Sequence, residues 1–503
     1  MKSLEEIIQA VPGLVLEGAH GASAMISQVS FDSRQVGAGT LFVALEGARQ
    51  DGHDFVEAAA GAGATAVLVN RSRLPAEALS CAVVSAVDTR ASLGALASAF
   101  YGAPSSRQGV IGITGTNGKT TTSYLIEAIF KAAGRAPGVI GTINYRWPGH
   151  VLAAPNTTPE SLVLHRLMAQ MEADGVADVV MEVSSHGLSS HRLGGVLFDV
   201  AVFTNLSQDH LDFHLSMQAY RDAKRRLFLE LLPAAAQTKR PRAVVNLDDE
   251  EGRALATLLA ARNDVALLTY SLRSAGADVH CLHIREHIEG TSFTVQTPAG
   301  ELSVETGLLG EFNVSNCLAA IGAALAMGVE LSAIRRGLAS LAGVAGRLER
   351  VDASSLPAAF VDYAHSPDAL ERALVTLRPL VTGKLIVVFG CGGDRDRHKR
   401  ALMGGIAARL ADQVVVTSDN PRNEDPEAII AAIVSGVAAA ESNAQLRCEP
   451  DRHLAIAQAI AGAADDDVVL IAGKGHENYQ EIGGVRYDFD DLDEARRALW
   501  GRR

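Results

Sequence analysis

The residues best suited to chemistry form one glycine-rich loop. Residues 115–120, Gly-Thr-Asn-Gly-Lys-Thr, follow the apolar run 109–114 and precede a helical pattern. Open backbone N–H groups, a lysine and a hydroxyl can hold nucleotide phosphates and a magnesium ion, and the start of the helix adds further donors. The general pattern has glycine where this chain has Ile113, so an ordinary strand–helix turn is the alternative. We interpret the segment as a phosphate loop.

Acidic groups at the ends of two apolar runs are the next candidates. Glu182 lies near the end of the run 179–183. A carboxylate there costs free energy unless it is paired or binds a metal, so we interpret it as a magnesium ligand or a water-positioning group. A second run ends in Asp209, His210, Asp212 and His214. Because magnesium prefers oxygen ligands, the residue types favour the aspartates over the histidines, with a solvated loop as the alternative.

Four turns in the C-terminal third each follow a short apolar strand. In an open parallel sheet the carboxyl ends of the strands line the ligand crevice, so we expect these turns to converge. They would bring together Asp362, His365, Arg395, Asp419, Asn420, Arg422, Lys474, His476 and Glu477. The two arginines Arg395 and Arg422 lie in turns rather than on a helix face, which favours binding. His365 could be only a loop residue, since Ser366 and Pro367 suit an N-cap and a first helical turn.

Several polar residues have a sufficient structural explanation. Ser33 lies in a turn that the side chains of its neighbours can cap. We favour this structural role over the binding of an anionic ligand. Thr158 suits an N-cap, followed by Pro159 in a first helical turn. Asn313 could cap a helix or face a nucleotide base. Nothing local distinguishes Lys224 from the solvated cationic face of a probable helix.

Strands and helices alternate along the sequence, which indicates an α/β protein whose elements position these residues. A chain of 503 residues is longer than a single hydrophobic core usually holds, so we expect about three domains. We expect a small α/β unit over 1–104, a parallel-sheet unit over 105–345 and a third unit over 346–503. Residues 270–305 favour an antiparallel insertion of short strands.

Composition excludes several classes of protein. The net charge of −13 argues against a nucleic-acid partner. The sequence contains no apolar run of about 18 residues and no signal-peptide pattern, so we expect a cytoplasmic protein without membrane insertion. The five cysteines are scattered, without the spacing of a zinc site or a disulfide framework.

Nine motifs, in order over nearly the whole chain, resemble those of the Mur ligases. They are GTNGKTT, EVSSHGL, FTNLSQDHLDFH, GEFNVSN, GRLE, VDYAHSPDAL, FGCGGDRD, SDNPR and AGKGHE. The resemblance is greatest to the members that add meso-diaminopimelate. The glycine loop of this family tolerates the residue found at Ile113.

The resemblance implies a fold and a reaction. The fold would comprise a small N-terminal α/β domain for the UDP-sugar, a central P-loop NTPase-like parallel sheet and a C-terminal Rossmann-like α/β domain. ATP, as co-substrate with Mg²⁺, would phosphorylate the D-glutamate carboxylate of UDP-N-acetylmuramoyl-L-Ala-D-Glu. The amine of meso-diaminopimelate would then attack the acyl phosphate, in peptidoglycan precursor synthesis. We expect a monomer.

The resemblance also implies roles for individual residues of the nucleotide site. Catalysis would rest on Lys119, Glu182, His210 and Lys224, the last carbamylated. The metal ligands would be Thr120, Glu182, His210 and the Lys224 carbamate, which would reverse the preference for the aspartates. ATP would contact Gly115, Thr116, Asn117, Gly118, Lys119, Thr120, Thr121, Asn313, Arg347 and Asp362.

Two further sets would bind the other substrates. The UDP-linked dipeptide would contact Ser33, Asn156, Thr157, Thr158, Ser184, Ser190 and Arg192. Relatives have glutamine where this chain has Ser190, so one hydrogen bond would be lost or taken over by water. Diaminopimelate would contact Arg395, Asp419, Asn420, Pro421, Arg422, Gly473 and Glu477. A planar guanidinium pairs with the distal carboxylate that lysine lacks, and lysine would leave that guanidinium buried and unpaired.

Two alternatives remain open. One is a ligase that resembles folylpolyglutamate synthase, against which the SDNPR segment and the first hundred residues speak. The other is a nucleotide-gated binding protein without turnover, which the retention of Glu182, His210 and Lys224 disfavours. Phosphate release that depends on substrate would separate the two.

Overall fold

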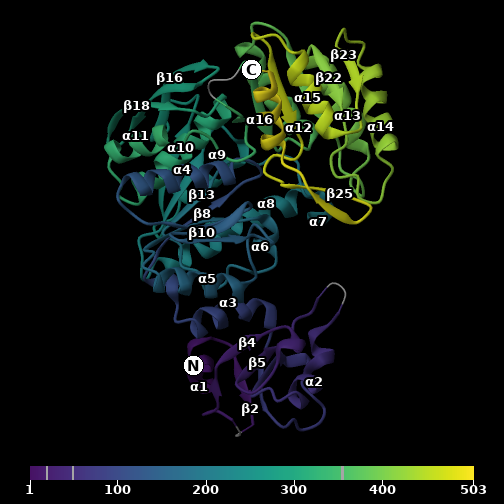
Figure 1. Ribbon diagram of the computed structural model, residues 1–503. Helices are drawn as coiled ribbons and strands as arrows, with labels where there is room; N and C mark the ends of the chain where they lie inside the picture. Colours follow the sequence, from purple (N-terminus) through teal and green to yellow (C-terminus); the bar gives the residue numbers. More distant parts are fainter. Residues whose placement is uncertain (19–20, 48–49, 353–355, 503) are drawn as a thin grey trace. The chain divides into compact units, whose positions relative to one another are not determined.

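The computed structural model describes residues 1–18, 21–47, 50–352 and 356–502. The chain divides into two compact units, and Figure 1 labels the helices and strands of both. The first comprises residues 1–280, 296–300 and 316–337, and the second comprises 281–295, 301–315 and 338–503. In the described residues, no helix has the length and apolarity that a bilayer crossing requires.

The N-terminal part of the first unit contains a five-stranded sheet in the order β2-β7-β6-β5-β4. The strands are β2 (Val15–Glu17), β4 (Gln28–Ser30), β5 (Thr40–Val43), β6 (Ala66–Asn70) and β7 (Ala82–Ala86). The helices are α1 (Leu4–Ala10), α2 (Val56–Gly61) and α3 (Thr89–Phe100), and β1 (Lys2–Ser3) pairs with β3 (Met25–Ile26). Successive residues of β5 and β6 enter different apolar cores, which explains their continuous apolar runs.

The glycine loop belongs to the larger sheet of the first unit, whose central strands run in parallel in the order β9-β12-β8-β13-β14-β15. The strands are β8 (Gly109–Thr114), β9 (Gly138–Ile140), β12 (Asp178–Glu182), β13 (Val200–Phe203), β14 (Arg242–Asn246) and β15 (Ala266–Ser271). Most apolar side chains of these strands are buried, and those at the start of β15 are only partly covered. Because neighbouring parallel strands end at one edge, the segments after β8, β9, β12 and β13 meet there.

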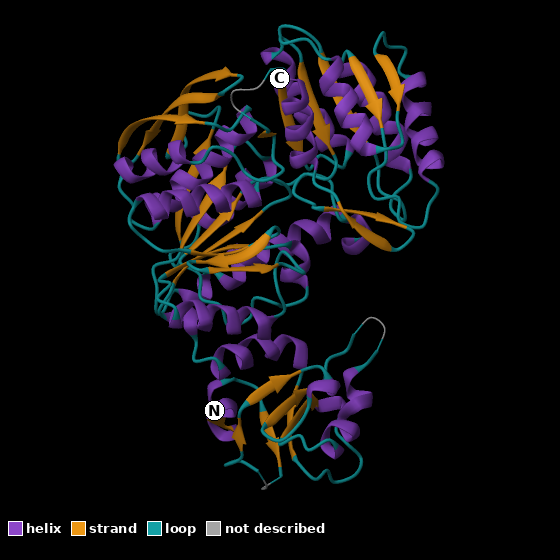
Figure 2. Cartoon of the chain, viewed as in Figure 1, coloured by secondary structure: helices purple, strands orange, loops and turns teal. Residues whose placement is uncertain are grey.

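Helices follow most of these strands, as a parallel sheet requires (Figure 2). They are α4 (Lys119–Ala132), α5 (Ser161–Ala173), α6 (Ser185–Ser189), α7 (Leu211–His214), α8 (Met217–Arg226) and α9 (Glu250–Ala260). Beyond β9, the sheet continues with β10 (Asn144–Trp147) and ends at the edge strand β11 (His150–Ala153), both in antiparallel pairing.

Three strands lie where we expected an antiparallel insertion of short strands, but they are seven to nine residues long and the first of them pairs in parallel with β15, which differs from that expectation. They are β16 (Val279–His287), β17 (Gly290–Thr297) and β18 (Gly300–Thr306), and β16 begins in parallel register with β15. These strands and helix α10 (Glu311–Ala326) contribute residues to both units, and α11 (Leu331–Ser340) follows.

The second unit contains a six-stranded sheet in the order β19-β20-β24-β21-β22-β23, parallel from β20 to β23. The strands are β19 (Glu349–Arg350), β20 (Ala358–Asp362), β21 (Leu385–Phe389), β22 (Gln413–Val416), β23 (Gln445–Cys448) and β24 (Val468–Ala472). The expected convergence of four turns is confirmed, because β20, β24, β21 and β22 are neighbours whose carboxyl ends share one edge.

Helices cover both faces of this sheet (Figure 2). One core contains residues of α12 (Pro367–Leu377), α13 (His398–Leu410) and α14 (Pro426–Ala439). The other contains residues of α15 (Arg452–Gly462) and α16 (Asp491–Arg502). A separate hairpin consists of β25 (Tyr479–Ile482) and β26 (Val485–Asp488).

Candidate active site

The glycine loop has the predicted strand–loop–helix geometry. It connects β8 to α4, and Gly115 and Gly118 have φ angles of 153° and 88°. A Cβ atom on Gly115 would overlap the hydroxyl of Thr204, and one on Gly118 would overlap the amide of Asn316. The Lys119 ammonium donates to the carbonyls of the loop itself, at 3.0 Å and 2.8 Å. Because a side chain at Gly115 or Gly118 would overlap a neighbouring residue, both glycines are required for this close packing of the loop.

Residues after β13 hold the interior of the loop, and sequence reasoning did not single them out. The amide N of Asn117 donates to Asn205 Oδ1 at 2.9 Å, and Thr116 Oγ1 donates to the carbonyl of Ser207 at 3.1 Å. The sequence feature that could have identified them is the FTNLS segment, a polar run at the end of a strand. Thr121 is buried in the first turn of α4.

Glu182 is buried, and threonines surround its carboxylate. Thr120 Oγ1 donates to Glu182 Oε2 at 2.9 Å, and Thr142 donates to the carboxylate through both Oγ1 and its amide N, each at 2.9 Å. Three donors therefore satisfy this buried acid. A threonine hydroxyl beside a carboxylate is an oxygen donor set that fits Mg²⁺. Thr142 was missed, although the Gly-Thr pair after β9 marks a strand end.

The Lys224 ammonium is buried beside the glycine loop. Its Nζ atom donates to the carbonyl of Gly115 at 2.8 Å and lies 4.5 Å from the centroid of the Tyr220 ring. Burial, with the nearby Lys119 ammonium, lowers the pKa of Lys224 well below its usual value. The interpretation of Lys224 as part of a solvated helix face is therefore wrong. No local pattern could have shown this, because the contact is tertiary.

His210 has a left-handed backbone, with φ of 52°, and its side chain is about half exposed. Its ring centroid lies 4.9 Å from that of His186 and 6.2 Å from that of Tyr220. Its Nε2 atom is 3.5 Å from an oxygen of Asp209. The side chain of Asp212, the other acidic candidate, lies outside the described part. The choice between His210 and the aspartates as metal ligands stays a prediction.

Several predicted dipeptide-binding residues gather around β12. Thr158 Oγ1 donates to the carbonyl of Glu182 at 2.8 Å and accepts from the amide of Ser184 at 2.9 Å. Arg192 donates to the carbonyl of Thr158 at 2.9 Å, and the Thr157 and Thr142 hydroxyls are 3.0 Å apart. Thr157 is therefore joined to the Glu182 carboxylate through Thr142, and Thr158, Ser184 and Arg192 are joined to the backbone of Glu182.

The expected N-cap role of Thr158 and the first-turn position of Pro159 are wrong. Helix α5 begins at Ser161, with Glu160 at the N-cap position. The Thr158 hydroxyl is already engaged by the two backbone groups of the β12 end. Tertiary hydrogen bonds outweighed the local capping preference.

Three other dipeptide-binding candidates lie in turns or at helix ends. Ser190 follows α6 at its C-cap, and the carbonyl of Asn156 accepts from the Tyr145 hydroxyl at 2.5 Å. Ser33 begins the 3₁₀ turn η1 (Ser33–Gln35), whose cap is Asp32, as the capped-turn interpretation predicted. No hydrogen bond in the described residues joins Ser33 to the cluster at β12.

The predicted adenosine contacts lie in the second unit. The carboxylate of Asp362 accepts from the amides of Leu348 and Ala364 at 2.6 Å and 2.8 Å, and burial raises its pKa to about 6. The guanidinium carbon of Arg347 lies 5.2 Å from the centroid of the Tyr363 ring. The positive charge of Arg347 lowers the pKa of Asp362 and so opposes the effect of burial. The buried amide of Asn313 donates to the Leu309 carbonyl at 2.8 Å. As predicted, Ser366 caps α12 and Pro367 begins it.

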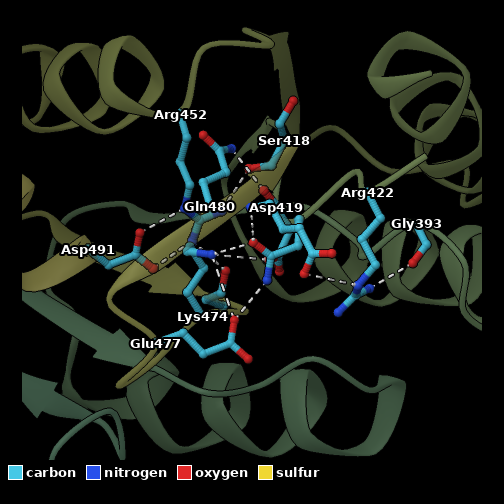
Figure 3. Close-up of polar contacts among 12 residues, drawn as sticks. Gly393, Ser418, Asp419, Arg422, Arg452, Lys474, Glu477, Gln480 and Asp491 are labelled. Atoms are coloured by element: carbon cyan, nitrogen blue, oxygen red, sulfur yellow. Dashed lines mark hydrogen bonds and ion pairs between the residues drawn. The ribbon is translucent and has the colours of Figure 1, made fainter. Parts of the chain in front are cut away.

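The segment after β22 holds most of the predicted amine-binding residues (Figure 3). Asn420 donates through Nδ2 to Glu477 Oε2 at 2.8 Å. Arg422, with φ of 53°, donates through Nη1 to the carbonyl of Gly393 at 2.7 Å. A Cβ atom on Gly473 would lie 2.6 Å from Asp419 Oδ2, so only glycine allows this approach.

The two arginines predicted to bind the amine substrate flank Gly392. A Cβ atom there would lie 3.0 Å from Arg422 Nη1 and 3.8 Å from Arg395 Cγ. Arg395 is exposed and contacts the carbonyl of Asp394 at 3.4 Å. The Pro421 carbonyl packs against Gly393 so closely that a side chain at Gly393 would overlap it.

The hairpin β25–β26 supports this segment and was not predicted. Its Gln480 side chain donates to the Asp419 carbonyl at 2.8 Å, and the Glu481 amide donates to Asn420 Oδ1 at 3.0 Å. Backbone hydrogen bonds also join Arg422 to Glu481 and to Gly483, at 2.9 Å and 2.7 Å. The sequence feature that could have predicted the hairpin is the Gly-Gly pair between two short runs in which apolar and polar residues alternate.

Three family models match successive parts of the chain. The Mur ligase family catalytic domain matches residues 25–101, the Mur ligase middle domain matches 113–324, and the Mur ligase glutamate ligase domain matches 346–475. The three-domain α/β fold class expected from the sequence is confirmed. The boundaries at residues 104 and 345 stay predictions.

Curated relatives match along nearly the full length. The chain is 46% identical to the UDP-N-acetylmuramoyl-L-alanyl-D-glutamate–2,6-diaminopimelate ligase of Synechococcus sp. strain WH7803, over 99% of both chains. It is also 46% identical to the ligase of that name from Pseudomonas aeruginosa, over 94% of this chain and 95% of the relative.

Solved structures extend the comparison. A ligase of the same name matches with a TM-score of 0.75 and 36% identity, over 100% of this chain and 99% of that one. A folylpolyglutamate synthase from Mycobacterium tuberculosis matches with a TM-score of 0.61 and 20% identity. The match covers 82% of this chain and 95% of the synthase. The second match shows a shared fold alone. The glycine loop, the buried Glu182 and the full-length similarity together show that this chain belongs to the Mur ligase family.

Proposed function

We propose that the chain is an ATP-dependent ligase that adds meso-diaminopimelate to the D-glutamate of UDP-N-acetylmuramoyl-L-Ala-D-Glu, in peptidoglycan precursor synthesis. The observation that carries the proposal is the 46% identity to a diaminopimelate-adding ligase over 99% of both chains. The Asp419–Arg422 segment beside Glu477 supports the choice of amine. We place the reaction in the cytoplasm, where ATP is available, and expect a monomer.

The first step would transfer the γ-phosphoryl group of ATP to the D-glutamyl carboxylate. Two anions approach each other, so catalysis rests on positioning and charge neutralisation. The loop amides, Lys119 and Thr121 would hold the phosphates, while Asn313, Arg347 and Asp362 would hold the adenosine. Mg²⁺ would neutralise phosphate charge, held by Thr120, Glu182 and His210.

Lys224 would contribute a second anionic ligand as a carbamate. The neutral amine attacks CO₂, forms an N–C bond and releases one proton, which yields a carbamate. A lowered pKa increases the neutral fraction of the Lys224 amine, and its position against the Gly115 carbonyl places it beside the phosphate loop. The product carries the negative charge that a metal cation prefers.

The acceptor would bind through the cluster at β12. Thr157 reaches the Glu182 carboxylate through the Thr142 hydroxyl. Thr158, which contacts Ser184 and Arg192, donates to the backbone carbonyl of Glu182. This connection supports placing the carboxylate that receives phosphate next to the residues that bind magnesium. Ser33, Asn156 and Ser190 complete the proposed set.

The second step would be attack of the diaminopimelate amine on the acyl phosphate. The new C–N bond forms as the C–O bond to phosphate breaks, and the amine releases a proton. Arg422 would pair with the distal carboxylate and Glu477 with the distal ammonium. Arg395, Asp419, Asn420, Pro421 and Gly473 would complete this set of contacts.

Phosphate release from the purified chain tests the proposal. We expect release with ATP, Mg²⁺, UDP-N-acetylmuramoyl dipeptide and diaminopimelate, and little release when lysine or glutamate replaces diaminopimelate. Equal use of diaminopimelate and lysine would overturn the substrate assignment. Release with a folate and glutamate would favour a folylpolyglutamate synthase, and nucleotide binding without release would favour a regulatory protein.

A further inference from the structure

Lys474 is a fully buried lysine that neither step of the proposed reaction uses. It follows β24 by two residues, and its side chain has 0% solvent exposure. A buried ammonium is stable only when it is paired and hydrogen-bonded. Its Nζ atom lies 2.9 Å from Asn420 Oδ1, 3.7 Å from Asp419 Oδ1 and 3.7 Å from Glu477 Oε2. All three partners belong to the proposed amine-binding set, and Figure 3 shows Lys474 beside Asp419 and Glu477.

The ammonium determines which way the Asn420 amide faces. Asn420 Oδ1 accepts from Lys474 Nζ and from the Glu481 amide, while Nδ2 donates to Glu477 Oε2. A flipped amide would present its NH₂ group to two donors and its oxygen to a carboxylate, so all three contacts would become repulsive. The network therefore allows one orientation.

Lys474 also opposes the effect of burial on Glu477. Burial raises the pKa of the Glu477 carboxyl, and the Lys474 ammonium lowers it. In turn, burial lowers the pKa of Lys474, which Asp419 and Glu477 oppose. The pairing favours a charged carboxylate, the form that binds an ammonium group.

A second buried ion pair supports the strand ends that carry these residues. Arg452 makes two contacts of 2.7 Å with Asp491, and both side chains are completely buried. The same guanidinium donates to the carbonyls of Ser418 and Ala472, at 3.3 Å and 3.0 Å. These carbonyls precede Asp419 and Lys474 by one and two residues. The backbone at both ends is therefore held independently of Lys474.

We propose that Lys474 is a positioning residue for the incoming amino acid, which orients the Asn420 amide and the Glu477 carboxylate toward its ammonium end. The inference rests on the proposed function. It predicts that loss of the ammonium weakens binding of diaminopimelate while the sites for ATP and the UDP-dipeptide are unaffected.

The primary test replaces Lys474 with methionine, which keeps the length of the side chain and removes its charge. In the full-length protein, the KM for diaminopimelate should rise about 10-fold or more. The KM values for ATP and UDP-N-acetylmuramoyl dipeptide should stay within about 2-fold, with a smaller change in kcat. An unchanged KM for diaminopimelate in active K474M would overturn the inference alone. An unmodified chain that shows no turnover would overturn the proposed function and the inference together.

A double-mutant cycle distinguishes positioning from general support of the fold. Because Lys474 acts partly through Asn420, K474M should raise the KM for diaminopimelate by a clearly smaller factor in an N420A background than in the unmodified chain. Additive effects of the two substitutions would contradict the inference. Lys239 offers a matched control, since its buried ammonium contacts Asp199 at 2.6 Å in the first unit. K239M should lower stability without raising this KM, and an equal rise would overturn the inference.

A milder variant covers the case in which K474M does not fold, as judged by circular dichroism and thermal unfolding. K474Q keeps an N–H donor for Asn420 Oδ1 and removes the charge. Its KM for diaminopimelate should lie between those of the unmodified chain and the N420A variant. A K474Q variant with the KM of the unmodified chain would overturn the inference.

Discussion

At the scale of single residues, the environment of Lys224 has the clearest chemical consequence. Its neighbours are the loop carbonyl of Gly115 and the face of the Tyr220 ring, and within the described residues no carboxylate is within salt-bridge distance of its ammonium. An unpaired buried lysine is costly unless it is neutral or modified. Carbamylation would replace that cation with an anion beside the proposed magnesium site.

Replacement of Lys224 by alanine tests this role. We expect phosphate release to fall roughly 100-fold, because a metal-supporting anion is lost. Acetate or formate should restore part of the activity, since a short carboxylate can occupy the vacated space. K239A is the control, and added acids should not increase its activity. Full activity of K224A without added acid would contradict the carbamate.

Arg422 determines, in our proposal, which amine is accepted. Replacement by lysine keeps the charge but removes the planar pair of donors that matches a carboxylate. We expect kcat/KM for diaminopimelate to fall about 10-fold in R422K and about 100-fold in R422A, with little gain for lysine as substrate. R486A serves as control, because Arg486 is an exposed cation on the neighbouring hairpin. Equal losses in R486A and R422A would argue against a specific contact.

At the scale of elements, helix α5 is anchored by a buried histidine. His165 Nε2 donates to the carbonyl of Gly194 at 2.9 Å, and burial lowers the pKa of His165 to about 4. An exposed histidine in the unfolded chain has a pKa near 6.5. Between about pH 4 and pH 6.5, His165 therefore binds a proton in the unfolded chain but stays neutral in the folded chain. The stability contributed by neutral His165 is therefore complete above about pH 6.5 and is lost as the pH falls toward 4.

This anchor predicts a specific pH dependence. Between pH 7 and pH 5, His165 should reduce the free energy of unfolding by about 2 kcal/mol. H165Q keeps a donor for the Gly194 carbonyl and cannot titrate, so its urea midpoint should fall less over the same interval. Equal falls for H165Q and the unmodified chain would show that His165 does not control the acid sensitivity.

At the scale of the whole molecule, our proposal places the binding sites for three substrates that carry anionic groups on one acidic chain. The net charge of −13 coexists with cations at the sites proposed for anionic substrates, such as Lys119, Arg192 and Arg422. Local placement of cations, rather than net charge, therefore governs which small anions bind. The parallel sheets of both units place polar loops at strand ends, so a short sequence change in a loop can alter substrate choice without altering the core.

The sequence by itself determined the α/β class, the phosphate loop and the convergence of the C-terminal turns. These features depend on local patterns, namely apolar strands followed by glycine-bearing polar turns, and on the rule that parallel strands end at one edge. The nine motifs identified the family, which the comparisons confirmed.

Only the tertiary structure decided how individual side chains are used. It buried Lys224, which local sequence placed on a solvated face, and it engaged the Thr158 hydroxyl with the end of β12 instead of a helix cap. It also joined Thr142 to Glu182, and Lys474 to Asn420 and Glu477. Apart from the pair Lys474–Glu477, each of these contacts joins residues at least 24 positions apart in the sequence. Burial and hydrogen bonding between distant segments arise only when the sheets assemble, so no local pattern encodes them.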